Sequence, residues 1–215
     1  MKIDNHFDVI IIGAGAAGLI CAMESGKRGK SVLLIDHSKK IGEKIRISGG
    51  GRCNFTNLNT HHSKFISKNN KFMVSALSQY TQYDFIKLVE SHKIKFHEKK
   101  LGQLFCDESS QQIIDMLLAE CEKSGVTLFK EKIVSNIFKN ENSYSIDLGD
   151  TSYTSSSLVV STGGLSVPKI GATKFGYDIA KKFGLEIIDP SAALVPLTLS
   201  DNILKMCKEL TGISK

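Results

Sequence analysis

A glycine-rich turn near the start of the chain most strongly limits the folds open to it. The turn follows an apolar strand predicted over residues 7–12 and opens a helix predicted over residues 16–27. Its three glycines, in G-x-G-x-x-G spacing, are Gly13, Gly15 and Gly18. The first permits the tight turn, the second lets the backbone approach a pyrophosphate, and the third lets the helix pack on the strand. The pattern predicts a dinucleotide bound at the positive N-terminus of that helix.

A second strand, predicted over residues 32–35, ends in an acidic residue, Asp36. In dinucleotide-binding domains a carboxylate about twenty residues beyond the glycines accepts hydrogen bonds from ribose hydroxyls. The same negative charge repels the 2′-phosphate of NADP. Because strand, turn, helix, strand and acid follow in this order, a chance glycine turn is the weaker interpretation.

Composition limits the class of protein. With 215 residues, 41% of them hydrophobic, the chain can form one large domain or one domain and part of a second. No apolar run approaches the roughly 20 residues of a membrane span, and the first six residues contain no apolar leader, so we expect a cytoplasmic protein without membrane contact. The five cysteines are scattered and lack C-x-x-C spacing. This argues against a disulfide framework and against a metal site.

The net charge of +6 raises the question of nucleic-acid binding. Between residues 60 and 100 the lysines alternate with polar and apolar residues and do not gather on one predicted helix. We therefore expect a solvated lysine-rich surface and no nucleic-acid partner. These lysines are Lys64, Lys68, Lys71, Lys87, Lys93, Lys95, Lys99 and Lys100.

Hydrophobic periodicity predicts two further helices and a third parallel strand. One helix covers residues 83–93. The other, capped by Ser109 or Ser110, repeats apolar residues at intervals of three and four and stops at Gly125. Residues 126–129 then form a strand after a connection long enough for a parallel crossover.

The period changes to two over residues 132–154, which predicts a small antiparallel meander with strands near residues 144–148 and 152–154. An apolar strand over residues 157–161 returns to the parallel sheet, and residues 176–183 form a helix. The predicted fold class is therefore α/β, a three-layer, dinucleotide-binding Rossmann-like domain whose parallel sheet contains an antiparallel β-meander crossover.

A second motif lies within residues 37–62, a stretch without hydrophobic periodicity that we expect to be a loop over a ligand. Three successive glycines, residues 49–51, would let the main chain approach a flat or anionic group, and Lys44 and Arg52 supply positive charge. A flexible surface loop is the alternative. Cys53 has no evident thiol partner, so we interpret it as structural and not redox-active.

Together these residues resemble the motifs of a family of bacterial flavoproteins with a glutathione-reductase-type FAD domain. The family includes aminoacetone oxidase and the 3-dehydro-bile-acid reductases, and the resemblance covers nearly all of the chain. The segments that carry it are Gly13–Gly18, Ser48–Asn57, Ser161–Gly164, Pro168–Gly171 and Ala193–Leu197.

The resemblance implies FAD as the cofactor and NAD(P)H as its reductant. It assigns no catalytic residue and indicates no substrate. The cofactor-binding residues expected from the motifs are Gly13, Gly15, Ala16, Ala17, Gly18, Asp36, His37, Lys44, Gly49, Gly50, Gly51, Arg52, Cys53, Asn54, Val134, Thr162, Gly163 and Gly164.

Members of that family are longer than this chain and carry a second domain after the Leu-Val-Pro-Leu segment. We therefore expect residues 1–192 to form the FAD-binding domain and residues 193–215 to begin a truncated second domain. Such a chain should have little activity alone, or should work with a separate chain that supplies the missing half. An NAD-dependent dehydrogenase domain and a non-catalytic nucleotide-binding module remain the alternatives.

Overall fold

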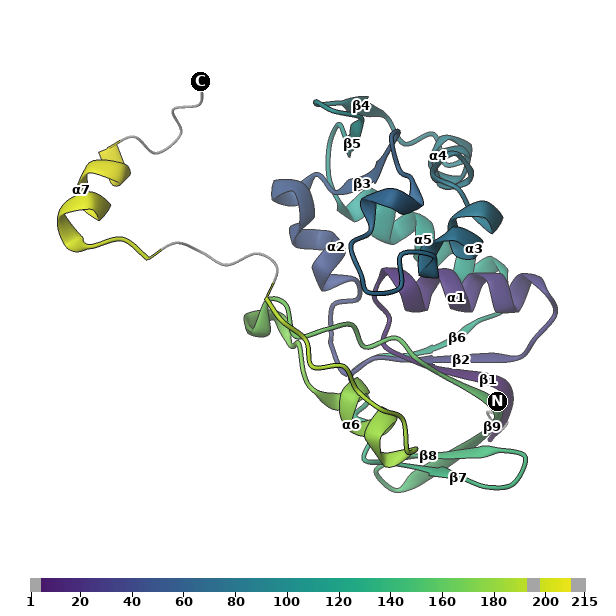
Figure 1. Cartoon of the computed structure of the whole chain (residues 1–215). Coiled ribbons are helices and arrows are strands. Elements are labelled where there is room, and N and C mark those ends of the chain that lie inside the picture. The colour runs from purple at the N-terminus through teal and green to yellow at the C-terminus, as the bar shows by residue number, and fades with distance from the viewer. Residues whose placement is uncertain (1–4, 193–197, 210–215) are drawn as a thin grey trace.

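The computed structural model describes residues 5–192 and 198–209. A six-stranded sheet with the order β6-β2-β1-β9-β8-β7 forms its centre (Figure 1). The strands β6, β2, β1 and β9 pair parallel with one another, whereas β8 pairs antiparallel with both β9 and β7. The strands are β1 (His6–Ile12), β2 (Val32–Ile35), β6 (Thr127–Phe129), β7 (Asn136–Lys139), β8 (Tyr144–Leu148) and β9 (Thr151–Val160).

Strand β9 is continuous where the sequence predicted two strands. Its first half pairs antiparallel with β8 and its second half parallel with β1, and Thr154 pairs on both sides. The separate strands predicted over residues 152–154 and 157–161 were therefore wrong. The serines at positions 155–157 hid the continuity because they are polar, yet they remain part of the extended strand. Ser155 pairs with both β1 and β8, and Ser157 pairs with β1. The meander is thus an extension of the parallel sheet.

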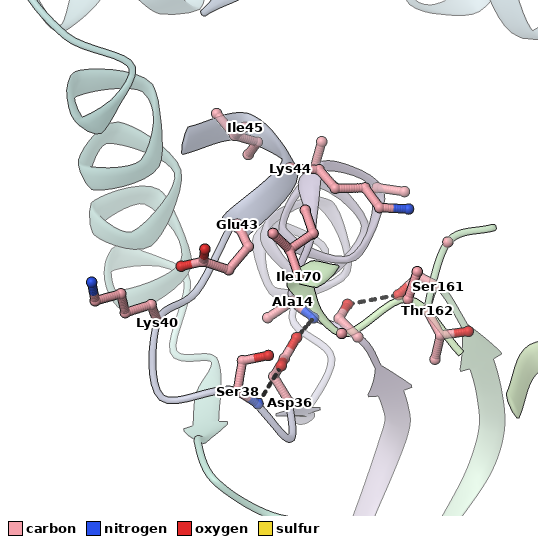
Figure 2. Close-up of a pocket in the computed structure, with 18 of the residues that line it drawn as sticks. Ala14, Asp36, Ser38, Lys40, Glu43, Lys44, Ile45, Ser161, Thr162 and Ile170 are labelled. Atoms are coloured by element: carbon pink, nitrogen blue, oxygen red, sulfur yellow. Dashed lines mark hydrogen bonds between the residues drawn. The ribbon is translucent and has the colours of Figure 1, made fainter. Parts of the chain in front are cut away.

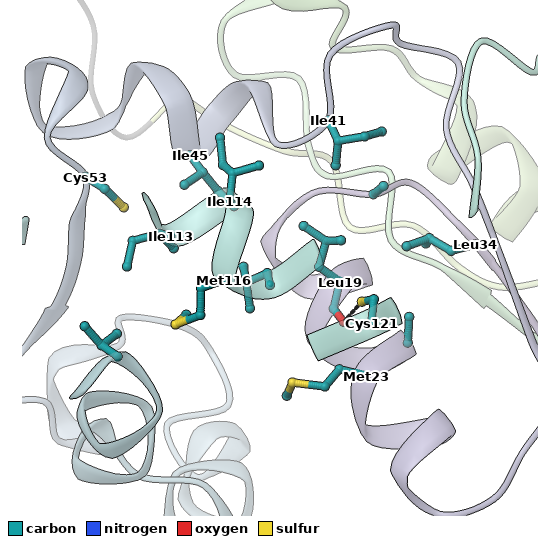
Figure 3. Close-up of a cluster of buried hydrophobic side chains, with 14 of the residues drawn as sticks. Leu19, Met23, Leu34, Ile41, Ile45, Cys53, Ile113, Ile114, Met116 and Cys121 are labelled. Carbon is teal, nitrogen blue, oxygen red and sulfur yellow. Dashed lines mark hydrogen bonds between the residues drawn. The ribbon is translucent and has the colours of Figure 1, made fainter. Parts of the chain in front are cut away.

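Two apolar cores lie on opposite faces of the sheet. Ile11 and Leu34 point into a core shared with helices α1 and α5 (Figure 3). Ile10 and Leu33 point the other way, into a core shared with the meander and helix α6. The predicted three-layer α/β fold is confirmed. The helices that cover the sheet are α1 (Ala16–Lys27), α5 (Gln111–Lys123) and α6 (Phe175–Lys182).

The segment predicted as a loop, residues 37–62, contains packed regular structure, so that prediction was wrong. Ile41, Ile45 and Cys53 are buried in the core beside α5. The elements are too short and too rich in glycine for a periodic pattern to emerge. They are α2 (Glu43–Ile47), the 3₁₀ turn η1 (Ser48–Gly51), β3 (Asn54–Asn57) and the 3₁₀ turn η2 (His62–Lys64).

A small three-stranded sheet, with the order β3-β5-β4, and two helices lie beyond α1 and α5, away from the main sheet (Figure 1). Helix α4 begins with a capping box in which Thr81 Oγ1 accepts from Asp84 N and Asp84 Oδ2 accepts from Thr81 N. This helix is the one predicted over residues 83–93. The elements are α3 (Phe72–Gln79), α4 (Gln82–Ser91), β4 (Phe96–Glu98) and β5 (Gln103–Cys106).

The predicted limits of α5 are confirmed. Ser109 Oγ accepts a hydrogen bond from the N–H of Gln111, and Gly125 ends the helix with a φ of +74°. The strand β6 and the helix α6 also lie where the sequence placed them. A last helix, α7 (Asp201–Glu209), has no buried residue. In the described residues, no helix is both long enough and apolar enough to cross a membrane.

Candidate nucleotide-binding site

A cavity of about 780 Å³ opens where β1, β2 and β9 end (Figure 2). Ile12, Asp36 and Ser161, at or just beyond the carboxyl ends of these strands, all line it. Helix α2 and the segment around Ile170 contribute further walls. In open parallel α/β sheets, ligands bind outside the carboxyl ends of the strands, where the connections diverge. The fold therefore places a cavity at the expected position.

The three glycines of the first turn have different surroundings. A Cβ on Gly13, whose φ is +102°, would lie 2.7 Å from the carbonyl oxygen of Ser161. A Cβ on Gly18 would lie 1.8 Å from the carbonyl oxygen of Gly13. Both positions are closed by backbone. A Cβ on Gly15 would meet nothing within 4 Å, and this residue lines the cavity. Gly13 and Gly18 thus permit packing, while Gly15 leaves space for a ligand.

The N-terminus of α1 opens into this space. Its N-cap residue, Gly15, provides no side-chain cap, and Ala16 and Ala17 of the first turn line the cavity. The first N–H groups of a helix have no partner within the helix, and the helix dipole makes this end positive. A pyrophosphate fits these donors.

Asp36 holds the glycine turn to the loop after β2. Its side chain is 13% exposed, and its two oxygens accept hydrogen bonds from Ala14 N and Ser38 N, each at 2.7 Å (Figure 2). His37 Nδ1 lies 3.7 Å from Asp36 Oδ1. An ionised carboxylate has about four lone-pair sites, so it retains capacity for a ribose hydroxyl. The sequence indicated the ribose contact but not the link to Ala14.

Lys44 connects two walls of the cavity. Its Nζ donates to the Gly164 carbonyl oxygen at 3.0 Å and to Ser166 Oγ at 3.1 Å, joining α2 to the segment after β9. Lys44, Thr162 and Gly163 line the cavity. Gly164 instead lines a smaller neighbouring cavity of about 350 Å³. Val134, just before the meander, is buried and lines the main cavity.

The three successive glycines lie next to the cavity without lining it. Residues 49–51 have φ values of +58°, +66° and +87°, a sharp turn that glycine adopts without strain. Neither they nor the exposed Arg52 line the cavity, whereas Cys53 and Asn54, which follow directly, do. The motif therefore positions the two residues after it.

Burial raises the pKa of the Cys53 thiol, and burial raises that of Cys106, in the same core, to about 11. Protonated thiols are poor nucleophiles, which supports the structural interpretation of Cys53. Within residues 5–192 and 198–209, no group of three histidine, cysteine or acidic side chains is arranged to hold a metal ion.

The apolar wall of the cavity was not recognised from the sequence. It comes from β3, α4 and α5, and the apolar side of α5 indicated only a buried helix face. The residues concerned are Phe55, Phe85, Ile113 and Leu117.

Two bacterial relatives align with nearly the whole chain. The ribosomal RNA dihydrouridine synthase of Escherichia coli (strain K12) is 50% identical over 210 residues, which are 98% of this chain and 52% of that protein. The protein of the same name from Haemophilus influenzae is 48% identical over 214 residues, which are 98% of this chain and 53% of that protein. The chain thus spans about half the length of these relatives.

Solved structures share the fold at low sequence identity. THI4 of Thermovibrio ammonificans superposes with a TM-score of 0.52 at 13% identity, covering 85% of this chain and 64% of that one. The 3-ketosteroid-delta4-(5alpha)-dehydrogenase of Rhodococcus jostii RHA1 superposes with a TM-score of 0.55 at 14% identity, covering 77% and 47%.

The family model described as "HI0933-like protein Rossmann domain" matches residues 7–213, a range that includes the glycine turn and every wall of the cavity. The 3-dehydro-bile acid delta(4,6)-reductase of Clostridium scindens is 22% identical over 190 residues, 87% of this chain and 46% of that protein. This identity is less than half that of the E. coli protein, so the sequence motifs indicated the wider family and not the particular subfamily. The chain belongs to the HI0933-like Rossmann-domain family.

Proposed function

We propose that the cavity binds FAD and that this chain is the cofactor-binding part of a flavin-dependent reductase. The open space at Gly15, beside an uncapped helix N-terminus, carries the proposal. The cavity volume of about 780 Å³ falls within the roughly 300–1,000 Å³ typical of cofactor and small-molecule sites.

Each wall of the cavity has a distinct part in this proposal. The first-turn N–H groups of α1, at Ala16 and Ala17, would bind the pyrophosphate, and Asp36 would accept from the ribose. The backbone of Val134 would contact the adenine. Thr162 would close over the nucleotide from the end of β9. All five residues line the one cavity.

The identity to ribosomal RNA dihydrouridine synthases suggests the substrate class. Reduction of a uracil ring to dihydrouracil adds a hydride and a proton across the C5–C6 double bond. Bound reduced FAD would supply the hydride, with NAD(P)H as the source of electrons. We therefore propose uridine in ribosomal RNA as the substrate of the whole protein. This differs from the expectation of no nucleic-acid partner, which rested on the scattered lysines.

The chain's share of this activity would be to hold the cofactor. We propose that residues 1–192 form the FAD-binding unit and that residues 193–215, which include α7, begin a second unit concerned with the substrate. Residues 193–197 and 210–215 lie outside the described part of the chain. On this proposal, the isolated chain binds FAD but reduces uridine slowly or not at all.

Flavin binding is tested by titrating the purified chain with FAD and following flavin fluorescence. The Gly15→Ala variant should bind FAD at least tenfold more weakly, equivalent to about 1.4 kcal/mol, because its methyl group enters the space for the pyrophosphate. Its backbone, at φ −81°, accepts alanine, so its thermal midpoint should match that of the wild type. Tight NAD⁺ binding without FAD binding would instead favour the NAD-dependent dehydrogenase.

The substrate is tested with the full-length relative from E. coli, in which this region can be replaced by the present chain. The chimera should restore dihydrouridine in ribosomal RNA of a strain lacking the relative, as measured by mass spectrometry of RNA nucleosides. A folded, FAD-bound chimera that restores none would contradict the substrate while leaving the cofactor assignment intact.

A further inference from the structure

The positive charge of the chain is concentrated in one part of the fold. Residues 61–100 contain eight lysines and three acidic residues, so they carry five of the chain's six net positive charges. All eight lysines are exposed. This stretch includes η2, α3, α4 and β4, which lie together on the outer side of α1 and α5 (Figure 1).

The same stretch exposes aromatic and aliphatic side chains. No residue from 61 to 80 is buried, although this segment forms the complete helix α3. Phe72 is 72% exposed and Ile66 is fully exposed, and Phe65, Tyr80 and Tyr83 are also exposed. We call these five side chains and the eight lysines the 61–100 surface.

Helix α4 links this surface to the cavity. Phe85 lines the cavity, while Tyr83 and Lys87 of the same helix are exposed on the 61–100 surface. A molecule held by the surface would therefore lie beside a wall of the site proposed for FAD.

We propose that the 61–100 surface binds single-stranded RNA, with lysines contacting phosphates and exposed aromatic rings stacking on bases. The proposal rests on the function proposed above and identifies where this chain would hold the RNA. Lysine is depleted in protein–protein interfaces, whereas it neutralises phosphates in nucleic-acid complexes. Aromatic rings stack on unpaired bases of any sequence. Excess lysine together with exposed rings thus fits RNA better than a protein partner.

The contribution of the lysines to RNA binding is tested by fluorescence anisotropy with a fluorescein-labelled single-stranded RNA of mixed sequence. The variant Lys64→Gln/Lys68→Gln/Lys71→Gln should bind about tenfold more weakly or worse, with a salt slope reduced by up to about 2 for three lost phosphate contacts. The matched control, Lys130→Gln/Lys139→Gln/Lys181→Gln, removes three exposed lysines elsewhere and should bind nearly as the wild type does. Equal losses in both triple variants would overturn the proposal, because they would indicate a non-specific charge effect.

Stacking is tested at Phe72 with the same RNA. Phe72→Ala should weaken binding by about 5- to 100-fold, and Phe72→Leu, which keeps an apolar side chain but lacks a ring, should weaken it nearly as much. Wild-type affinity in Phe72→Leu would refute stacking. A dimer of the chain that dissociates in Phe72→Ala, without RNA binding, would show that the surface binds protein.

Separate variants test the proposed FAD site and the proposed RNA surface, so one proposal can be refuted without the other. Gly15→Ala should lose FAD and keep RNA, while the Lys64/Lys68/Lys71 variant should lose RNA and keep FAD. Loss of FAD binding in the surface variant would mean that the variant is misfolded, and Phe72→Leu then decides the proposal.

Discussion

Helices α1 and α3 both contain many apolar residues, yet several of these residues are buried in α1 and those of α3 are largely exposed. Leu19 and Met23 of α1 are almost fully buried, whereas no residue of α3 is buried and Phe72 is largely exposed. The difference comes from the surface that each helix meets. A Cβ on Gly18 or on Gly26 would overlap neighbouring backbone, so glycine lets α1 pack closely on both sides. Apolar content alone does not bury a helix.

The strongest test of this contrast is Gly18→Ala. The new methyl group would lie 1.8 Å from the Gly13 carbonyl oxygen, so α1 must move away from β1. We expect unfolding by urea to show a loss of about 3 kcal/mol or more. Gly15→Ala, three residues earlier, is the matched control and should change stability by less than about 1 kcal/mol. Similar stability in both variants would refute the close packing at Gly18.

A smaller loss is expected at Glu120, which joins α5 to α1. Its side chain is buried, with Oε2 3.0 Å from Lys27 Nζ and Oε1 3.1 Å from His92 Nε2. Glu120→Gln should cost about 1–3 kcal/mol at pH 7, because it removes a charged acceptor. The exposed Glu122→Gln control should stay within about 0.5 kcal/mol of the wild type.

The effect of Glu120 should depend on pH. Hydrogen bonding to Lys27 is the largest cause that lowers the pKa of this carboxyl. A carboxyl whose pKa is lower in the folded state stabilises the fold at pH values above its unfolded-state pKa, which is about 4.3 for glutamate. This stabilisation is lost as the pH falls through the folded-state pKa. The difference between wild type and Glu120→Gln should therefore shrink in acid. A constant difference down to pH 3 would mean that charge is not its cause.

The smallest effect is expected on α3. Phe72→Ser replaces a ring that is 72% exposed, so the free energy of unfolding should change by no more than about 0.5 kcal/mol. Leu19→Ser, at a fully buried position of α1, is the contrasting control and should unfold the chain at much lower denaturant. A large loss from Phe72→Ser would show that α3 is packed within the chain.

The parts of the fold predicted correctly are those with a regular period. The glycine turn, β2 and α5 each combine a pattern with a clear start or stop signal, and their limits agree with the structure. The elements α2, β3 and β5 were missed because each has only four or five residues and mixes polar with apolar ones. Strand β2 is equally short, but all four of its residues are apolar, and such a run predicts a buried strand.

For the candidate site, the sequence indicated the residues at the strand ends but not the apolar wall of the cavity. Asp36 and Thr162 follow predicted strands, so they were expected at one edge of the sheet. Phe85 and Leu117 come from helices whose orientation over the cavity depends on tertiary packing. Arg52 differs in the opposite way, since its charge suggested a direct contact with the cofactor, yet the residue is exposed and does not line the cavity.

The pairing of β1 with β9 determines when the central sheet can form during synthesis of the chain. His6 and Thr154, which face each other across these strands, are 148 residues apart, so one side of β1 has no strand to pair with until β9 has been made. At 5–20 residues per second, the ribosome needs about 7–30 s to add those residues. During that interval β1 presents the apolar run Val9–Ile12 with an unsatisfied edge, the kind of segment that chaperones retain and that other nascent chains can join. The nucleotide site, which needs the end of β9, is completed only after that delay.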